Sequence, residues 1–236
     1  MQLSQPYESP ALRKAIGPAL RPGGLELTER AARFCELATG DRVLDVGCGI
    51  GTTAAFLQNH FRATAVGIDA ATLLLAEARE GYPALPLVRG DGARLPFASG
   101  LFSAVFCECV LSLLSNHQKA LSEFYRVLRP GGHLVVADLY WRSCGPPDVT
   151  PPPAGRGCLA GALTRYELEQ RVANAGFALS LWEDHSEHLK RLAAKLVWDG
   201  IPVTDLWGAT CRPGSGATGR PGYGLLVCQK RRPPHG

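Results

Sequence analysis

A run of glycines after an apolar strand is the stretch best suited to bind a nucleotide-like ligand. Gly47, Gly49 and Gly51 occupy every second position after the apolar run 43–46, and a helix is expected to follow. Glycine lets the backbone turn tightly and lets a ligand lie against it with no Cβ between them. Asp69 ends the next apolar run. Strand, glycine turn, helix, strand and acid make up the first half of a nucleotide-binding βαβ unit.

The spacing of these glycines bears on which cofactor is bound. Dinucleotide folds usually read G-x-G-x-x-G and place a pyrophosphate at the helix N-terminus, whereas this chain reads G-x-G-x-G. Asp45 lies just before the glycines, and a carboxylate there suits a ligand with an ammonium group better than one with two phosphates. A nicotinamide oxidoreductase is therefore the less favoured alternative, and an ordinary loop between strand and helix is the plainest one.

Composition sets broad limits on the function. The chain has 236 residues, of which 46% are hydrophobic, and this fits one α/β domain with additions. A net charge of +4 is too small to argue for a nucleic-acid partner. No apolar run is long enough for a membrane span, and no signal pattern opens the chain, so we expect a cytoplasmic protein. The sequence does not indicate an oligomeric state.

Eight cysteines are many for a cytoplasmic enzyme, and they stand at positions 35, 48, 107, 109, 144, 158, 211 and 228. No C-x-x-C pair occurs and no histidine spacing completes a zinc site, so we predict no metal centre. A cytoplasmic setting also argues against a disulfide framework. Cys35, Cys48 and Cys228 are interpreted as small buried hydrophobic residues.

Apolar runs alternate with helical patterns along most of the chain. This rhythm predicts an α/β, Rossmann-like, seven-stranded and mostly parallel sheet with helices on both faces and an antiparallel last strand. The expected strands are 42–46, 63–68, 85–89, 102–107, 133–139, 177–182 and 223–230. Ligands of such sheets bind at the carboxyl ends of the strands, where the polar residues of this chain gather.

Two kinds of segment flank this pattern. Residues 1–40 are expected to form an N-terminal helical lid, with a helix over 27–37 and Thr28 as its N-cap. The rest, 41–236, is expected to be the ligand-binding domain, with insertions at about 141–163 and 185–222. Thr164 and Glu167 form a capping-box pattern that predicts a helix start.

The motifs V-L-D-V-G-C-G-I-G, G-I-D, G-D-G-A-R-L-P-F and Y-R-V-L-R-P-G-G-H-L resemble those of the class I S-adenosylmethionine-dependent methyltransferases of the type 11, or UbiE-like, group. The resemblance implies S-adenosylmethionine as cofactor. It assigns the ribose to Asp69 with Ala70 beside it, and the adenine amine to Asp91 with Gly92. The methionine part is assigned to the turn: Asp45, Gly47, Cys48, Gly49 and Gly51.

The residues after the fourth strand are implied to face the sulfonium and the acceptor. These are Cys107, Glu108 and Cys109 in the motif C-E-C-V-L-S-L-L. The two cysteines are expected to point to different faces, so that at most one meets the ligand. Glu108 is a candidate proton acceptor for an oxygen or nitrogen nucleophile.

A narrower resemblance links C-E-C-V-L-S-L-L and G-R-G-C-L-A-G-A-L to the arsenite methyltransferases. It implies that Cys158 binds trivalent arsenic, with Cys211 as the nearest candidate for a second thiol. Thiolates are suitable ligands for such a soft element. The chain departs from that pattern because residues 1–34 and the helix after the glycine turn hold no cysteine.

The motif L-R-P-G-G-L-E-L-T-E-R-A is also similar to little-characterised methyltransferases of anaerobic bacteria, which need not act on arsenic. We therefore expect methyl transfer to a small molecule, with thiolate-bound arsenite as one candidate. The alternative is a protein that binds S-adenosylmethionine or a metalloid on the same fold without turnover.

Overall fold

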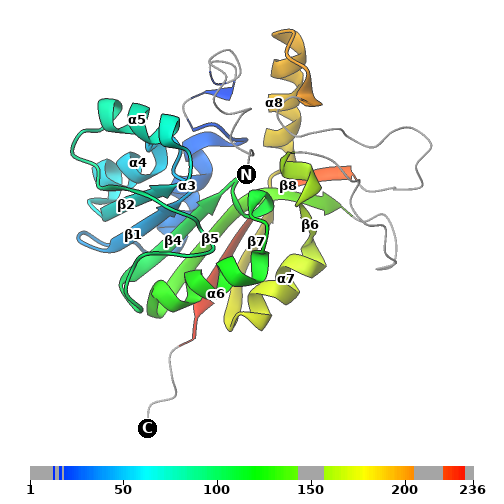
Figure 1. Ribbon diagram of the computed structural model, residues 1–236. Coiled ribbons are helices and arrows are strands. Elements are labelled where there is room, and N and C mark those ends of the chain that lie inside the picture. Colours follow the sequence, from blue (N-terminus) through cyan, green and yellow to red (C-terminus); the bar gives the residue numbers. More distant parts are fainter. Residues whose placement is uncertain (1–12, 14–15, 18, 143–156, 205–219, 232–236) are drawn as a thin grey trace.

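One mixed β-sheet runs through the molecule and carries helices on both faces (Figure 1). The computed structural model describes residues 13, 16, 17, 19–142, 157–204 and 220–231. Within these residues the strands are β1 (Arg42–Val46), β2 (Thr64–Asp69), β3 (Leu87–Arg89), β4 (Phe102–Glu108), β5 (Leu128–Arg142), β6 (Leu163–Thr164), β7 (Phe177–Asp184) and β8 (Arg220–Lys230).

The strand order is β3-β2-β1-β4-β5-β8-β7, with β6 paired to the end of β5. β1 to β5 pair in parallel, and β8 is antiparallel to both β5 and β7, so the predicted antiparallel last strand is confirmed. The described sheet has eight strands rather than the predicted seven. The added strand, β6, has only two residues, too few for a periodic pattern to reveal it.

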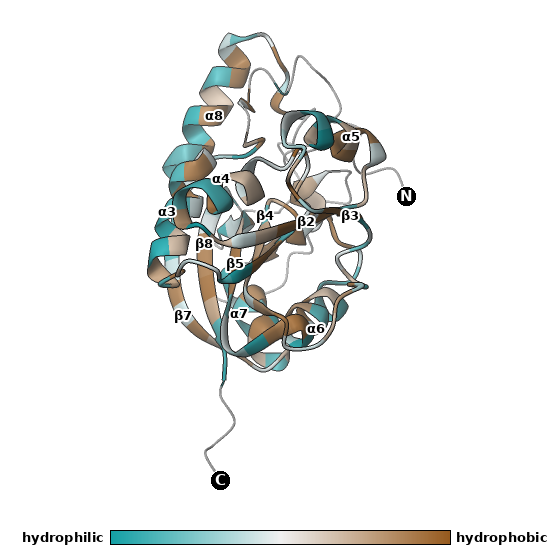
Figure 2. Ribbon diagram, turned by 90° about the vertical axis from the view of Figure 1, so that its left-hand side faces the viewer, coloured by the Kyte–Doolittle hydropathy of each residue, from teal (hydrophilic) through white to brown (hydrophobic). Residues whose placement is uncertain are grey.

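The helices divide between the two faces of the sheet (Figures 1 and 2). One face carries α3 (Gly24–Phe34), α4 (Thr52–Phe61), α5 (Thr72–Gly81) and α8 (Ser186–Trp198). The other face carries α6 (His117–Val127) and α7 (Arg165–Asn174). Two short 3-10 helices, η1 (Leu111–Leu113) and η2 (Cys158–Ala160), lie in the loops at the carboxyl end of the sheet.

The core has a layer on each side of the sheet, and β4 supplies both layers. Ala104 and Phe106 point into the layer under α3, α4 and α8, while Val105 and Cys107 point into the layer under α6 and α7. This is the two-residue alternation of a strand. All residues of β4 are buried, as expected for a central parallel strand covered on both faces.

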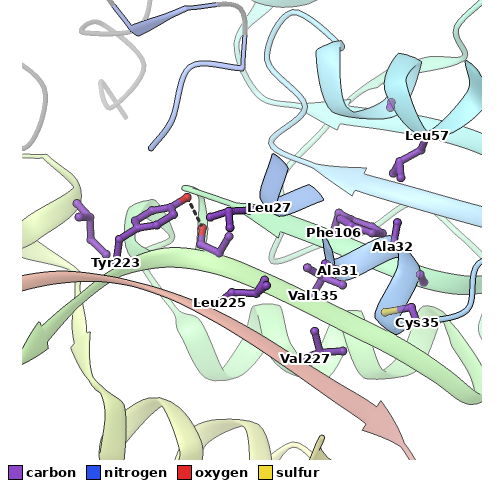
Figure 3. Packing of buried hydrophobic residues seen from close by; sticks show 14 of the residues in the cluster. Leu27, Ala31, Ala32, Cys35, Leu57, Phe106, Val135, Tyr223, Leu225 and Val227 are labelled. Atoms are coloured by element: carbon purple, nitrogen blue, oxygen red, sulfur yellow. Dashed lines mark hydrogen bonds between the residues drawn. The ribbon is translucent and has the colours of Figure 1, made fainter. Parts of the chain in front are cut away.

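The segment predicted as a lid contributes a helix to this core. Figure 3 shows α3 side chains against residues of β4, β5 and β8, namely Leu27, Ala31, Ala32 and Cys35 against Phe106, Val135, Leu225 and Val227. The helix begins at Gly24 after the left-handed Gly23 (φ 76°), not at a Thr28 cap. Thr28 is buried inside α3, because its hydroxyl bonds to Glu108 rather than to a helix end. The residues before 13 lie outside the described part of the chain.

The capping box of α7 is confirmed. Thr164 Oγ1 accepts from the Glu167 N–H at 3.2 Å, and the Glu167 carboxylate accepts from the Thr164 N–H at 2.8 Å. These bonds satisfy backbone donors that the first turn of a helix leaves open. They also fix the direction in which the chain leaves β6.

Replacing the cap should destabilise the fold without changing the carboxyl edge of the sheet, where the glycine turn lies. We expect Thr164→Ala to lower the free energy of unfolding by about 1 kcal/mol, measured by chemical denaturation. Thr72→Ala is the matched control, because Thr72 is exposed at the start of α5 and makes no side-chain cap. It should change stability by less than about 0.5 kcal/mol. Equal effects of the two substitutions would contradict the capping role.

Candidate active site

The glycine turn between β1 and α4 has the backbone that only glycine adopts freely. Gly47, Gly49 and Gly51 have φ angles of 70°, 53° and 83°. These lie in the left-handed region, which is strained for other residues. A Cβ on Gly47 would lie 2.2 Å from Cγ2 of Val110, so the backbone there is in contact with the segment after β4.

Asp69, at the end of β2, holds this turn in place. One of its carboxylate oxygens accepts from the Gly49 N–H at 2.8 Å, and the other accepts from the Ala71 N–H at 2.7 Å. The side chain is half-buried, and Ala70 beside it is exposed. Asp69 and the glycines therefore form one unit at the carboxyl edge, as the sequence predicted. Ribose binding by Asp69 stays a prediction.

Asp45 lies beneath the turn and is only 3% exposed. Its Oδ2 has no hydrogen-bond partner among the described residues. Burial, and then the negative charge of Glu108, raise the pKa of Asp45 to about 8, although Arg21 acts in the opposite direction. A buried acceptor without a partner is unfavourable, and it is the kind of group that a bound donor would satisfy.

Asp91 and Gly92 lie after β3, at the same edge. Asp91 is exposed, and one of its carboxylate oxygens accepts from the Ala93 N–H at 2.9 Å. Gly92 is buried, and a Cβ there would lie 2.9 Å from Cγ1 of Val46 at the end of β1. The predicted adenine residues thus lie beside β1, but adenine binding stays a prediction.

Glu108, predicted as a proton acceptor, is instead the centre of a buried network. Arg21 Nη2 lies 2.7 Å from its Oε2, and the two side chains are 5% and 2% exposed. The hydroxyls of Thr28 and Thr53 also donate to the carboxylate, at 3.0 Å and 3.1 Å. Because three donors from three segments already occupy Glu108, we do not assign it the role of a general base.

Two of the predicted cysteines point away from the carboxyl edge. Cys48 packs beneath the turn, where its Sγ would lie 2.7 Å from a Cβ on Gly67. Cys107 is fully buried in the core layer under α6 and α7. Burial raises the pKa of both thiols well above the ordinary range. Their thiols pack in the interior, so only their backbone lies near the predicted cofactor site.

Cys109 breaks the alternation of β4. Its φ of 56° is left-handed, which is uncommon for a residue with a side chain. A regular strand would put Cys109 on the same face as Cys107, but this backbone places it against the opposite core layer. Its Sγ lies 3.2 Å from the Tyr223 hydroxyl oxygen. Cys107 and Cys109 thus face different sides, as predicted, for a reason that the sequence pattern does not contain.

Tyr223 fixes the protonation of Cys109. The Tyr223 hydroxyl donates to the Ala137 carbonyl at 3.2 Å (Figure 3), and this uses its single proton. The thiol must then donate to the phenol oxygen, so Cys109 is a protonated thiol here. Burial raises the pKa of Cys109, and the Asp138 carboxylate and the Cys158 thiol raise it further.

Cys158 is brought to the same place by a pair of packed turns. It begins η2 and is 1% exposed. A Cβ on Gly161, just after η2, would lie 2.0 Å from the Ser112 carbonyl oxygen, so η2 is pressed against η1. Asp138 fixes η1 by accepting from the N–H and the hydroxyl of Ser112, both at 2.8 Å. Cys109 and Cys158 therefore belong to one cluster, while Cys211 lies outside the described residues.

Sequence reasoning missed two members of this edge. Arg21 lies in the motif L-R-P-G-G-L-E-L-T-E-R-A, but nothing in that motif points to Glu108, which is far away in the chain. The sequence pattern identified Tyr223 only as part of a strand. The available signal for Arg21 was its place in a motif that is similar to those of other methyltransferases.

Comparisons with known proteins agree with this arrangement. A family model described as a methyltransferase domain matches residues 44–136, which include the glycine turn, Asp69, Asp91 and Glu108. The chain is 44% identical over 99 residues to a demethylmenaquinone methyltransferase of Beutenbergia cavernae, a match that covers 42% of this chain and 41% of that protein. Residues 44–136 thus carry a methyltransferase domain, and the chain is similar to S-adenosylmethionine-dependent methyltransferases. The cofactor of this family is S-adenosylmethionine.

Another relative is named for a different acceptor. The chain is 30% identical over 152 residues to an arsenite methyltransferase of Halobacterium salinarum, and the match covers 61% of this chain and 39% of that protein. The chain thus spans about two fifths of the length of these two curated relatives. None of the helices in its described part has the length and apolar character of a membrane span.

Solved structures show the same fold over nearly the whole methyltransferase. The cyclase SpnF matches with a TM-score of 0.72 and 25% identity, over 92% of this chain and 84% of that chain. Phosphoethanolamine N-methyltransferase 2 of Haemonchus contortus, in complex with S-adenosyl-L-methionine, matches with a TM-score of 0.71 and 18% identity, over 94% of this chain and 56% of that chain.

The raised pKa of Asp45 predicts a pH-dependent stability. Between about pH 4 and pH 8 the folded methyltransferase holds a proton that the unfolded chain has lost. The contribution of Asp45 to stability is therefore greatest at low pH and is lost as the pH rises through 8. Asp45→Asn cannot ionise, so its stability relative to the parent should increase from pH 5 to pH 9 in denaturation experiments without cofactor. Asp199→Asn, at the exposed end of α8, is the control, and a pH-independent difference for Asp45→Asn would contradict the assignment.

The contact at Gly161 predicts a second effect on stability. Gly161→Ala should force η2 away from η1 and lower the free energy of unfolding by about 1–3 kcal/mol. Gly81→Ala is the matched control, because Gly81 ends α5 and a Cβ there would meet nothing within 4 Å. Chemical denaturation of both variants measures the difference, and a neutral Gly161→Ala would show that the two turns are not tightly packed.

Proposed function

We propose that this chain transfers a methyl group from S-adenosylmethionine to a small-molecule acceptor. The observation that carries this proposal is the buried, unpartnered Oδ2 of Asp45 below a left-handed glycine turn. The residues fit the cofactor, because the turn leaves backbone free of Cβ atoms and Asp45 offers an acceptor for the ammonium group. Asp69 and Asp91 lie at the same edge to receive the ribose and the adenine amine.

We further propose that the acceptor is a soft, trivalent metalloid such as arsenite, held by Cys158 and Cys109. Both cysteines lie in or against the same core layer, and Cys158 is among the groups that raise the pKa of Cys109. The likeness to an arsenite methyltransferase supports this acceptor, and the likeness to a demethylmenaquinone methyltransferase supports an organic one. Thiol sulfur favours the metalloid.

The proposed binding of arsenite and the methyl transfer balance in atoms and electrons. Arsenous acid, As(OH)3, condenses with two thiols to form two As–S bonds and releases two molecules of water. S-adenosylmethionine would supply a methyl carbon on a sulfonium sulfur, and the lone pair of the bound arsenic would form the new bond to it while the carbon–sulfur bond breaks and its electrons stay on sulfur. Arsenic would thereby pass from As(III) to a cationic As(V), whose remaining hydroxyl would lose its proton to water. Cys109 and Cys158 hold arsenic in line with that carbon and need no general base. This agrees with a Glu108 that is committed to Arg21.

A protein that binds the cofactor or the metalloid without turnover is the alternative. It would keep the same turn and the same thiols and would differ from an enzyme only in forming no product. Product formation distinguishes the two.

The deciding experiment measures S-adenosylhomocysteine released from S-adenosylmethionine in the presence of arsenite and a small thiol. We expect release by the parent protein and a loss of at least tenfold in Cys158→Ser and in Cys109→Ser. Cys228→Ser is the matched control, because Cys228 is also buried but lies in the layer under α6 and α7. It should retain activity.

Three other outcomes would change the proposal. Release that survives in both thiol variants would remove the metalloid site but keep methyl transfer. No release with arsenite, together with cofactor binding and release with an organic acceptor, would do the same. Binding of S-adenosylmethionine without release across a panel of acceptors would favour the alternative without turnover.

A further inference from the structure

Two buried polar atoms, one on an acid and one on an arginine, lack partners at the glycine turn. One is Oδ2 of Asp45, and the other is Nε of Arg21, which has no hydrogen-bond partner among the described residues. The two residues are 3% and 7% exposed. An unsatisfied buried donor or acceptor is unfavourable, and more so when it is charged. An unpartnered carboxyl oxygen beside an unpartnered guanidinium nitrogen indicates a ligand that carries both an ammonium and a carboxylate.

Arg21 is held beside the turn by fixed contacts. Its Nη1 donates to the Ala19 carbonyl at 3.0 Å, and its Nη2 pairs with Glu108 at 2.7 Å and also bonds to Thr28. These bonds occupy both terminal nitrogens, and Nε is left without a partner among the described residues. The preceding residue, Leu20, lies over the turn, with its Cδ1 3.8 Å from the Cβ position of Gly49.

Four titratable groups act on Arg21. Glu108 and Asp45 are the acids that act on Arg21, and Tyr223 and Cys109 are the neutral titratable groups near it. An α-amino acid carries a carboxylate and an ammonium on one carbon. Placed here, its carboxylate would meet Arg21 and its ammonium would meet Asp45, so that charges alternate from Glu108 to Asp45.

We infer that Arg21 binds the α-carboxylate of the methionine part of S-adenosylmethionine, through the Nε that no residue occupies. The inference rests on the proposed function only for the cofactor, not for the acceptor. It makes the segment from Leu20 to Thr28 part of the cofactor site. The amino-acid end of the cofactor would then be bound by a residue outside the glycine turn.

The test compares two ligands that differ only in the carboxylate. One is S-adenosylhomocysteine, and the other is its decarboxylated analogue, 5′-(3-aminopropylthio)adenosine, which keeps the ammonium. Isothermal titration calorimetry should show the parent protein binding the analogue about 10–100-fold more weakly, the range expected for a buried hydrogen bond to a charged group. Arg21→Gln should bind S-adenosylhomocysteine as weakly as the analogue, and should bind the analogue as the parent does.

A second pair of variants separates recognition from folding. Arg21→Lys keeps a positive charge opposite Glu108 but has no Nε donor, so it should show the same loss of discrimination in a folded protein. Arg33→Lys, at an exposed arginine of α3 bonded to Glu29, is the matched control and should discriminate as the parent does.

The outcomes are distinct. Equal weakening of both ligands by Arg21→Lys would mean that Arg21 only holds the segment in place, and would overturn the inference. Unchanged discrimination in the variants would overturn it as well. A parent protein that binds neither adenosyl compound would instead refute the proposed function.

Discussion

The buried carboxylate of Glu108 is the constraint on which the carboxyl edge of this sheet depends. A charge with a side-chain exposure of 2% is stable only when it is paired and hydrogen-bonded. Its partners come from the N-terminal segment, from α3 and from the first turn of α4: Arg21, Thr28 and Thr53. Removing one partner of such a pair typically costs about 3–5 kcal/mol, because the other charge stays buried. The position of β4 is thereby tied to all three segments.

The network around Glu108 separates the carboxyl edge of the sheet into two regions. On the side of β1 lie the glycine turn, Asp45 and Asp69, to which the proposed function assigns the adenosyl ligand. On the side of β5, the left-handed Cys109 turns the chain towards Tyr223, and Asp138 fixes η1 so that η2 can bring Cys158 close. Glu108 lies between them as the last residue of β4. A methyl donor on one side and a nucleophile on the other would thus meet at the end of β4, where parallel α/β sheets bind their ligands.

Local patterns in the sequence were enough for the sheet, the glycine turn and its acids, because these depend on residues close together in the chain. They failed where a contact spans a long separation. Thr28 satisfied the local rule for a helix cap, but its hydroxyl bonds to Glu108, 80 positions away. Glu108 looked like a free acid for the same reason. The left-handed backbone of Cys109 is set by tertiary contacts and has no signature in the letters C-E-C.

The protonation of the thiol cluster bears on which ligand it can take. A metal cation needs thiolates, so its binding must expel protons from thiols. That is unfavourable for Cys109, whose pKa is raised by burial and by the charge of Asp138, and whose proton is committed to Tyr223. Arsenous acid is neutral and exchanges hydroxyl groups for thiols with loss of water, so it leaves no net charge behind in the apolar layer. Under the proposed function, the features that make these thiols poor ligands for a cation are therefore the ones that suit them to a neutral metalloid.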